Sequence, residues 1–136
     1  MILTADRFIY DILTADATLT TAVGTRIYSE VAPEGTTSPW IVYQCQTPES
    51  RSVVGLGGVV IMIDEVYTVR AICQGNDYST IETIANRIIT LLHHKHGAVT
   101  SGYALACELA GTIKYHTVED GVSYRHLGAM FRINSQ

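Results

Sequence analysis

The stretch that decides the fold runs from Leu13 to Gln44 and reads LTADATLTTAVGTRIYSEVAPEGTTSPWIVYQ. Asp16 directly precedes residues 17–23 and is placed to accept a hydrogen bond from the first turn of a helix there. Gly24 follows, at a position where a helix end favours a residue in the left-handed conformation. These two signals predict a short helix over 17–23 with a defined start and a defined end.

Two strands and an exposed loop complete this stretch. Apolar and aromatic runs predict strands over 26–31 and 40–46. Pro33 and Pro39 interrupt the chain between the two runs, so the intervening segment is predicted to be a loop.

Two further helices are predicted from apolar residues at helical spacing. The first spans 5–14 with Thr4 at its start, and the last spans about 79–95, where Ser79 and Glu82 form a capping box. The predicted apolar faces are Ala5, Phe8, Ile9, Ile12 and Leu13 in the first helix and Ile81, Ile84, Ala85, Ile88, Leu91 and Leu92 in the last.

Residues 59–74 alternate between apolar and polar side chains and predict one long strand. Sixteen extended residues span about 50 Å at ~3.3 Å each, whereas a domain of this length is only about 35–40 Å across. The strand is therefore expected either to bend near Asp64 and Glu65 or to project from the domain at one end. A projecting, partly apolar ribbon would reach an adjacent subunit.

The segment 47–58 is predicted to be a loop because it contains three glycines and a proline. It also carries Val53, Val54 and Leu56, although long loops are usually polar. Two interpretations stay open: the apolar side chains order against a neighbouring protein, or they pack back onto their own core.

The C-terminal region is predicted to be a hairpin around residues 119–121. A two-residue turn would place Ile113 opposite Gly128 and Leu109 opposite Arg132. A three-residue loop shifts the register by one and brings apolar side chains and opposite charges together. Its pairs are Leu109 with Phe131, Ile113 with Leu127, Cys107 with Ile133 and Glu108 with Arg132. We therefore predict the second register.

Together these elements predict one α+β domain over 1–136. We expect a mainly antiparallel sheet of about five strands, with the helix at about 79–95 across one face and N-terminal helices at about 5–14 and 17–23.

Charged residues are scarce in this chain of 136 residues. They make up 16% of it, against about 25% in typical soluble domains. No apolar run approaches the ~20 residues that cross a bilayer, so we expect no membrane partner. We expect instead that another protein covers part of the surface. The alternative is a compact monomer whose surface is rich in Thr and Ser.

The net charge is −4 and the chain has only two lysines, so tight binding to a phosphate backbone is not expected. Cys45, Cys73 and Cys107 lie in apolar strand patterns, at spacings far from a metal-binding signature. An odd number of cysteines without a basic leader predicts assembly in a reducing cytoplasm.

Histidines near the end of the last predicted helix are the clearest candidates for chemistry. His93 and His96 are three residues apart, so on a helix both could touch one metal ion. No cysteine or carboxylate lies nearby in sequence to complete the site, and we interpret these histidines as complementing the helix dipole. His116 and His126 are predicted to face solvent or an interface.

Carboxylate and glycine patterns give no sign of catalysis. Asp64 and Glu65 are adjacent, so in a strand they point to opposite faces and cannot act as a pair. Glu65 is predicted to form a strand-end or interfacial ion pair. The glycines at 55–58 precede a strand and lack the Gly-Lys-Ser/Thr of a phosphate loop. We predict no catalytic residue, no cofactor and no metal ligand.

The order and spacing of residues 13–44 resemble the tail-completion (tail-terminator) proteins of long-tailed bacteriophages, and the pair Tyr124-Arg125 is similar to that family as well. The resemblance implies a non-enzymatic virion protein that forms a six-subunit ring and closes the tail tube where it meets the head. The implied partners are further copies of the chain, the tail-tube protein and the head connector or stopper, with DNA passing through the ring without specific binding. The residues that carry over as fold determinants are Arg26, Tyr28, Trp40 and Tyr43.

For contacts with neighbouring copies, the residue pattern selects the loop and the long ribbon. The candidates are Arg51, Val53, Val54, Leu56, Asp64, Glu65 and Arg70. Repeated heterologous contacts between such surfaces close into a ring. Two alternatives stay open: a head-side connector or stopper ring subunit, and a small metal-binding enzyme that uses His93 and His96.

Overall fold

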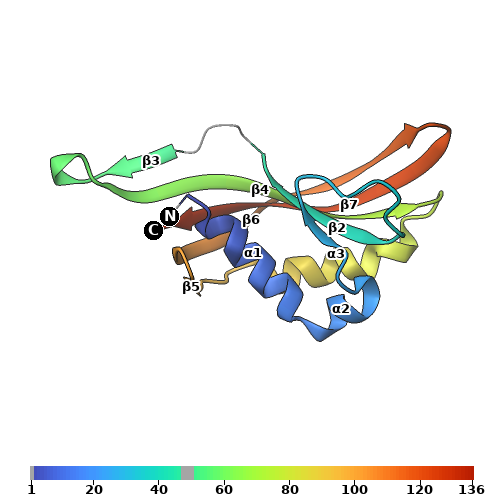
Figure 1. Ribbon diagram of the computed structural model, residues 1–136, viewed down its shortest axis with the longest axis horizontal. Coiled ribbons are helices and arrows are strands. Elements are labelled where there is room, and N and C mark those ends of the chain that lie inside the picture. Colours follow the sequence, from blue (N-terminus) through green and yellow to red (C-terminus); the bar gives the residue numbers. More distant parts are fainter. Residues whose placement is uncertain (1, 47–50) are drawn as a thin grey trace.

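In the computed structural model, which describes residues 2–46 and 51–136, a curved sheet of seven strands carries three helices on one face (Figure 1). The helices are α1 (Thr4–Ala15), α2 (Ala17–Val23) and α3 (Ser79–Leu92). The strands are β1 (Ile27–Ser29), β2 (Trp40–Cys45), β3 (Arg51–Val54), β4 (Val60–Gln74), β5 (Gly97–Val99), β6 (Gly102–Glu119) and β7 (Val122–Ser135), with a 3-10 turn η1 (Leu56–Gly58).

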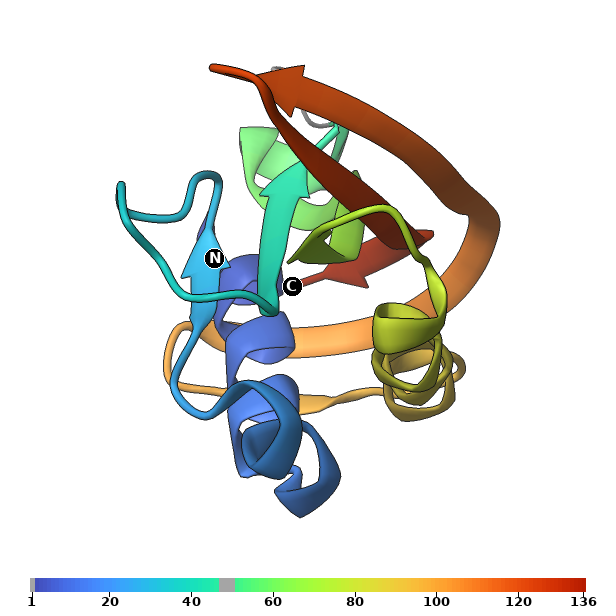
Figure 2. The same cartoon turned by 90° about the vertical axis from the view of Figure 1, so that its right-hand side faces the viewer.

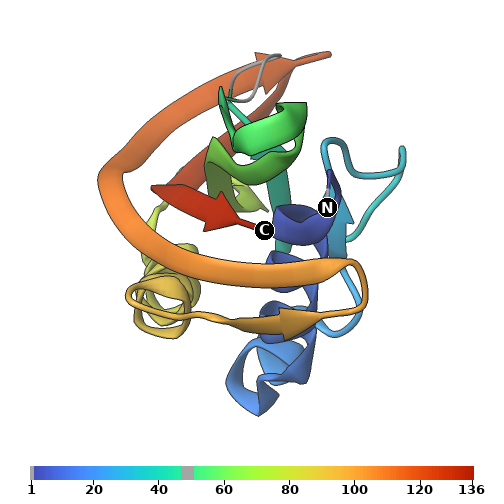
Figure 3. The same cartoon turned by 90° about the vertical axis from the view of Figure 1, so that its left-hand side faces the viewer.

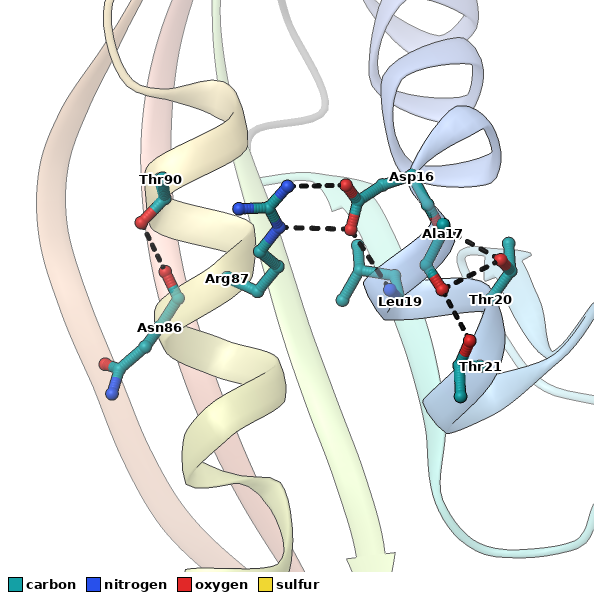
Figure 4. Close-up of polar contacts among 8 residues, drawn as sticks. All are labelled: Asp16, Ala17, Leu19, Thr20, Thr21, Asn86, Arg87 and Thr90. Atoms are coloured by element: carbon teal, nitrogen blue, oxygen red, sulfur yellow. Dashed lines mark hydrogen bonds and ion pairs between the residues drawn. The ribbon is translucent and has the colours of Figure 1, made fainter.

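The predicted helix signals around Asp16 and Gly24 are confirmed. The Asp16 carboxylate accepts a hydrogen bond from the backbone N–H of Leu19 at 3.0 Å, and it also binds the Arg87 guanidinium of α3 at 2.6 and 3.1 Å (Figure 4). Gly24 ends α2 with a φ of 62° and a ψ of −126°, so the positive φ is as expected although the ψ is not that of a left-handed helix. Thr4 lies inside α1 and is fully buried, with its hydroxyl donating to the Ser101 carbonyl.

Both ends of α3 differ from the prediction. The Asp77 carboxylate accepts from the backbone N–H and the hydroxyl of Ser79 at 2.9 and 2.7 Å. The N-cap residue is Tyr78, which makes no side-chain cap, and Ser79 is already the first helical residue, so the predicted capping box with Glu82 is wrong. The helix ends at Leu92 and not near residue 95, since His93 adopts an extended conformation.

The sheet order is β1-β2-β4-β7-β6-β5, with β3 added to the free part of β4. β1 and β2 are parallel, and the other neighbours are antiparallel. The sheet has more strands than the predicted five. β3 lies within the segment 47–58 that is predicted to be a loop, and β5, which directly follows the histidines, has no counterpart among the predicted strands. Residues 47–50 of that predicted loop lie outside the described residues.

One end of the long strand β4 projects from the domain, which is one of the two predicted possibilities. It pairs with β7 without a break from Ile63 opposite Ser135 to Gln74 opposite Tyr124, so this ladder has no bulge at Asp64. Its N-terminal end, from Val60 to Asp64, pairs with β3, and the resulting hairpin extends from one end of the molecule (Figure 1).

The β6–β7 register combines the two alternatives. A two-residue turn at Asp120 and Gly121, with φ values of 49° and 77°, places Ile113 opposite Gly128, so the predicted three-residue loop is wrong. The register then shifts between Leu109 and Gly111. Past this bulge the predicted pairs occur: Leu109 with Phe131, Glu108 with Arg132 and Cys107 with Ile133.

One face of the sheet forms the core with α1 and α3. Tyr67, Val69 and Ala71 of β4 and Phe131 and Ile133 of β7 are buried on this face. β6 curves strongly, and its hairpin end arches over β2 and β4 on the other side (Figure 2 and Figure 3). That second face, which the helices do not cover, is called the open face below.

Three of the residues carried over from the resemblance hold β1 and β2 in place. The Arg26 Nε donates to the Pro39 carbonyl at 2.9 Å, next to the start of β2. Trp40 packs edge-to-face on Tyr124 with ring centroids 6.0 Å apart, and Tyr43 is buried in the core.

Candidate functional site

The hairpin formed by β3, η1 and the start of β4 carries an exposed apolar surface. Val53, Val54, Leu56, Val59 and Ile61 are 42%, 56%, 101%, 62% and 47% exposed. We call residues 53–61 the hairpin tip. The chain has no charged residue between Ser52 and Ile63. The tip therefore does not pack back onto its own core, and that interpretation is wrong.

The backbone of the hairpin tip has a defined turn. The Gly55 N–H donates to the Val59 carbonyl at 2.7 Å. Gly57 and Gly58 follow with φ values of 79° and 77°, which residues with a Cβ rarely adopt. The hydrogen bond from Gly55 to Val59 and the two glycines therefore define the turn that carries Leu56.

The candidate contact residues fall into three places. Val53, Val54 and Leu56 lie together on the hairpin, where Arg51 begins β3 opposite Asp64. Asp64 and Arg70 lie on the open face, and Asp64 forms an ion pair with Arg132 at 3.2 Å. Glu65 points to the helix-covered face and is 9% exposed, so the structure separates it from the others.

A hydrogen-bonded polar row crosses the open face. The Arg70 Nε donates to the His126 Nδ1 at 3.3 Å, and its Nη1 donates to the Gln44 Oε1 at 3.3 Å. The His126 Nε2 contacts the Thr117 hydroxyl at 3.0 Å, and the Tyr115 ring stacks on the imidazole with centroids 4.4 Å apart. Burial and the nearby Arg70 lower the pKa of His126 to about 4. This neutral, buried histidine supports the sheet, contrary to the prediction that it faces solvent or an interface, whereas His116 is exposed.

A groove of about 710 Å³ lies between the loop after β1 and the β6–β7 turn. Its rim carries the carboxylates Glu30, Glu34, Glu119 and Asp120, while Arg70 is the one Lys or Arg among its described lining residues. Carboxylates at the rim disfavour a phosphate ligand. The groove is therefore not a candidate nucleotide or nucleic-acid site.

A second polar group, buried between α1, β2 and β4, was not anticipated from sequence. The Cys45 Sγ donates to the Glu65 Oε2 at 3.7 Å, and the Glu65 Oε1 is buried without a hydrogen-bond partner. The Tyr67 hydroxyl donates to Asp6 at 3.0 Å. Burial raises the pKa of Glu65 and of Asp6.

Glu65 does not form the predicted ion pair within its own chain. Among the side chains that the structure describes, the ion pairs are Asp16 with Arg87 and Asp64 with Arg132. The signal for its burial was present in the sequence, since Glu65 is the charged exception on the apolar side of β4. An interfacial role for it remains a prediction.

His93, His94 and His96 contact the edge of β6. The His93 Nδ1 accepts from the backbone N–H of Leu109 at 3.0 Å, and the His94 N–H donates to the Cys107 carbonyl at 2.8 Å. His96 contacts the Tyr103 hydroxyl. The proposed helical spacing of His93 and His96 is absent because α3 has already ended. The described part of the chain contains no group of three side chains suited to hold a metal ion.

Cys73 and Cys107 are buried thiols. Burial raises the pKa of Cys107 to about 12 and also raises that of Cys73, so neither is a reactive thiolate. No helix in the described ranges is long and apolar enough to span a membrane.

Comparisons with known proteins agree with this geometry. A family model described as "Tail completion protein gp17" matches residues 7–116. A chain in a solved structure titled "Virion of native gene transfer agent (GTA) particle" superposes with a TM-score of 0.71 at 15% sequence identity. The alignment covers 94% of this chain and 92% of that chain, and at this identity it shows a shared fold. Among curated proteins no sequence matches this chain.

Proposed function

Because this chain belongs to the tail completion protein gp17 family, a family of non-enzymatic virion tail components, we propose that it is the ring subunit that ends the tail tube and joins it to the head connector. The ring contains six copies. One ring face contacts the last layer of tail-tube protein, and the other contacts the connector or stopper of the head.

The hairpin tip is the observation that carries this proposal. Leu56 is fully exposed, and its apolar neighbours lie on the hairpin tip, residues 53–61, which contains no charged residue. Burying one Val or Leu side chain contributes roughly 1.5–3 kcal/mol, so a monomer leaves considerable stabilising energy unused. A hairpin at one end of an elongated subunit suits a heterologous contact, in which each copy inserts its tip into the next and the series closes.

The charge of the chain suits a passage for DNA. The net charge is −4, and carboxylates surround the groove on the open face. A ring of such subunits offers few cationic side chains to a phosphate backbone, which suits DNA passing without specific binding.

The test combines purified protein with tail tubes that lack an end cap. Electron microscopy of the tube ends is expected to show a ring, and six copies of a 14.9 kDa chain give a mass of about 89 kDa. Tubes whose ends stay bare at every protein concentration would contradict the proposal.

Leu56→Asp tests the role of the hairpin tip. It should change the free energy of unfolding of the monomer by less than about 0.5 kcal/mol because the side chain is fully exposed, yet it should prevent ring formation. Val31→Asp is the matched control, since Val31 is 76% exposed but lies on a loop far along the chain from the hairpin tip. Rings that form equally well with both variants would show that the tip is not the contact.

A further inference from the structure

We propose that β3 of one copy adds as an extra strand to the outer edge of β6 in the next copy, so that the sheet continues across the ring contact. This inference rests on the proposed ring function and specifies how neighbouring subunits meet. The occupant of the β6 edge is therefore a second copy of this chain.

Half of the outer edge of β6 has no partner within the described residues. β5 covers residues 102–104, and the segment of His93 and His94 covers Cys107 and Leu109. From Gly111 to Glu119 the strand pairs with β7 on one side, and no described strand lies on the other. A strand edge of this length without a proline is a ready template for another strand.

The hairpin geometry identifies the backbone groups that point outward. In a two-residue hairpin the residues that flank the turn, here Glu119 and Val122, exchange both hydrogen bonds, and the pairs then alternate. The N–H and C=O groups of residues 112, 114, 116 and 118 consequently point away from β7. The Ser123 carbonyl accepts a hydrogen bond from the Gly75 N–H at 2.9 Å, so the backbone of Ser123 points away from β6. Ser123 lies opposite Val118, and its orientation agrees with this alternation.

β3 supplies a complementary edge. It pairs with β4 alone among the described strands, so its outer edge is unpaired as well. It lies at the opposite end of the molecule from the β6–β7 turn (Figure 1), so one copy cannot join its own two edges. A contact between edges at opposite ends is heterologous and can repeat around a ring.

The side chains near the two edges are compatible. Val53 and Val54 of β3 are exposed, and so are Tyr115 and Val118 of β6, which are 40% and 62% exposed. Arg51 is the one charged residue of β3, so strand addition brings no like charges together except in a register that places Arg51 beside Lys114. In strand addition the backbone hydrogen bonds supply affinity and the side chains supply specificity.

His116→Pro tests the backbone contact. Its N–H points outward, so proline removes a donor for the incoming strand and leaves the β6–β7 bonds intact, as edge strands tolerate. His116→Ala is the matched control because it removes the same side chain and keeps the N–H. Compared with that control, the protein concentration at half assembly of the ring should rise about tenfold, the change expected for one lost backbone hydrogen bond. Equal assembly of the two variants would overturn the inference.

Amide hydrogen exchange on the wild-type chain decides the question independently, even if the proline variant does not fold. Exchange at residues 112–118 and 51–54 should slow in the ring relative to the monomer. A ring whose amides at both segments exchange as fast as in the monomer overturns the inference but not the proposed ring. In a ring that has formed without tubes, slowing at 112–118 that appears only after tail-tube protein is added also overturns it, because the tube is then the occupant. A wild-type chain that never forms a ring overturns the proposed function together with this inference.

Discussion

Asp16→Ala is expected to destabilise the fold because Asp16 serves two elements at once. Its carboxylate accepts from the Leu19 N–H at the start of α2 and binds Arg87 of α3 through both oxygens (Figure 4). The side chain of Asp16 is 9% exposed and that of Arg87 is 36% exposed. The substitution therefore leaves one helix start without its acceptor and one guanidinium without its partner.

The lost cap sets the lower bound of the effect. Replacing an N-cap Asp by Ala costs about 1 kcal/mol, within a range of roughly 0.5–2 kcal/mol. The unfolding entropy of about 2.1 cal/mol/K per residue gives roughly 0.29 kcal/mol/K for 136 residues, so 1 kcal/mol corresponds to a Tm lower by about 3–4 °C. Loss of the Arg87 contact adds to this.

Asp16→Asn separates the two contributions, because Asn is an equally good N-cap but carries no charge. In thermal and urea unfolding, Asp16→Asn should be about as stable as Arg87→Ala. Both variants should be clearly more stable than Asp16→Ala. The double variant Asp16→Asn with Arg87→Ala should be no less stable than the less stable of its two single variants, because both remove the same ion pair.

The pH dependence has a definite sign. Hydrogen bonding to Arg87 and to the Leu19 N–H holds the pKa of Asp16 below its ordinary 3.8. The stabilisation is therefore present above about pH 4 and is lost as the pH falls through the lowered pKa. Asp16→Ala with an unchanged Tm, or with the same Tm as Asp16→Asn, would refute the reasoning.

Two further substitutions test the packing and the buried polar group. Gly128→Ala should cost about 3 kcal/mol or more, because the added Cβ would lie 2.1 Å from the Val69 carbonyl oxygen of β4. Gly111→Ala should destabilise the protein far less, because its Cβ would meet only the flexible end of Met130 at 3.2 Å. Equal losses of unfolding free energy for the two variants in urea would contradict this reasoning. Glu65→Gln should raise the free energy of unfolding at pH 7–8, because burial raises the pKa of Glu65 and penalises its charged form. The wild type should gain stability relative to Glu65→Gln as the pH falls through that raised pKa, and a destabilised variant at pH 8 would argue against this.

Local signals in the sequence predicted the elements whose hydrogen bonds are local. Asp16, Gly24 and the apolar face of α3 depend on residues within a few positions, and their roles follow from helix geometry alone. The start of α3 shows the limit of this reasoning. Ser79 and Glu82 match a capping pattern, but the helix begins at Ser79 itself, whose N–H and hydroxyl both donate to Asp77.

Features that depend on distant partners were harder to predict. The β6–β7 hairpin has no single register, because the bulge between Leu109 and Gly111 lets the tight turn and the apolar pairs coexist. β3 is too short for a period-two pattern to identify, and it forms because β4 offers an unpaired edge. For the contact surface, the apolar residues Val53, Val54 and Leu56 were found from composition, but only the fold shows that they project together.

The most direct test is a map of the assembled tail end at a resolution that places side chains. We expect Val53, Val54 and Leu56 of each copy to be buried against the adjacent copy. A ring in which these three side chains stand in solvent and touch no other chain would contradict the account at its centre.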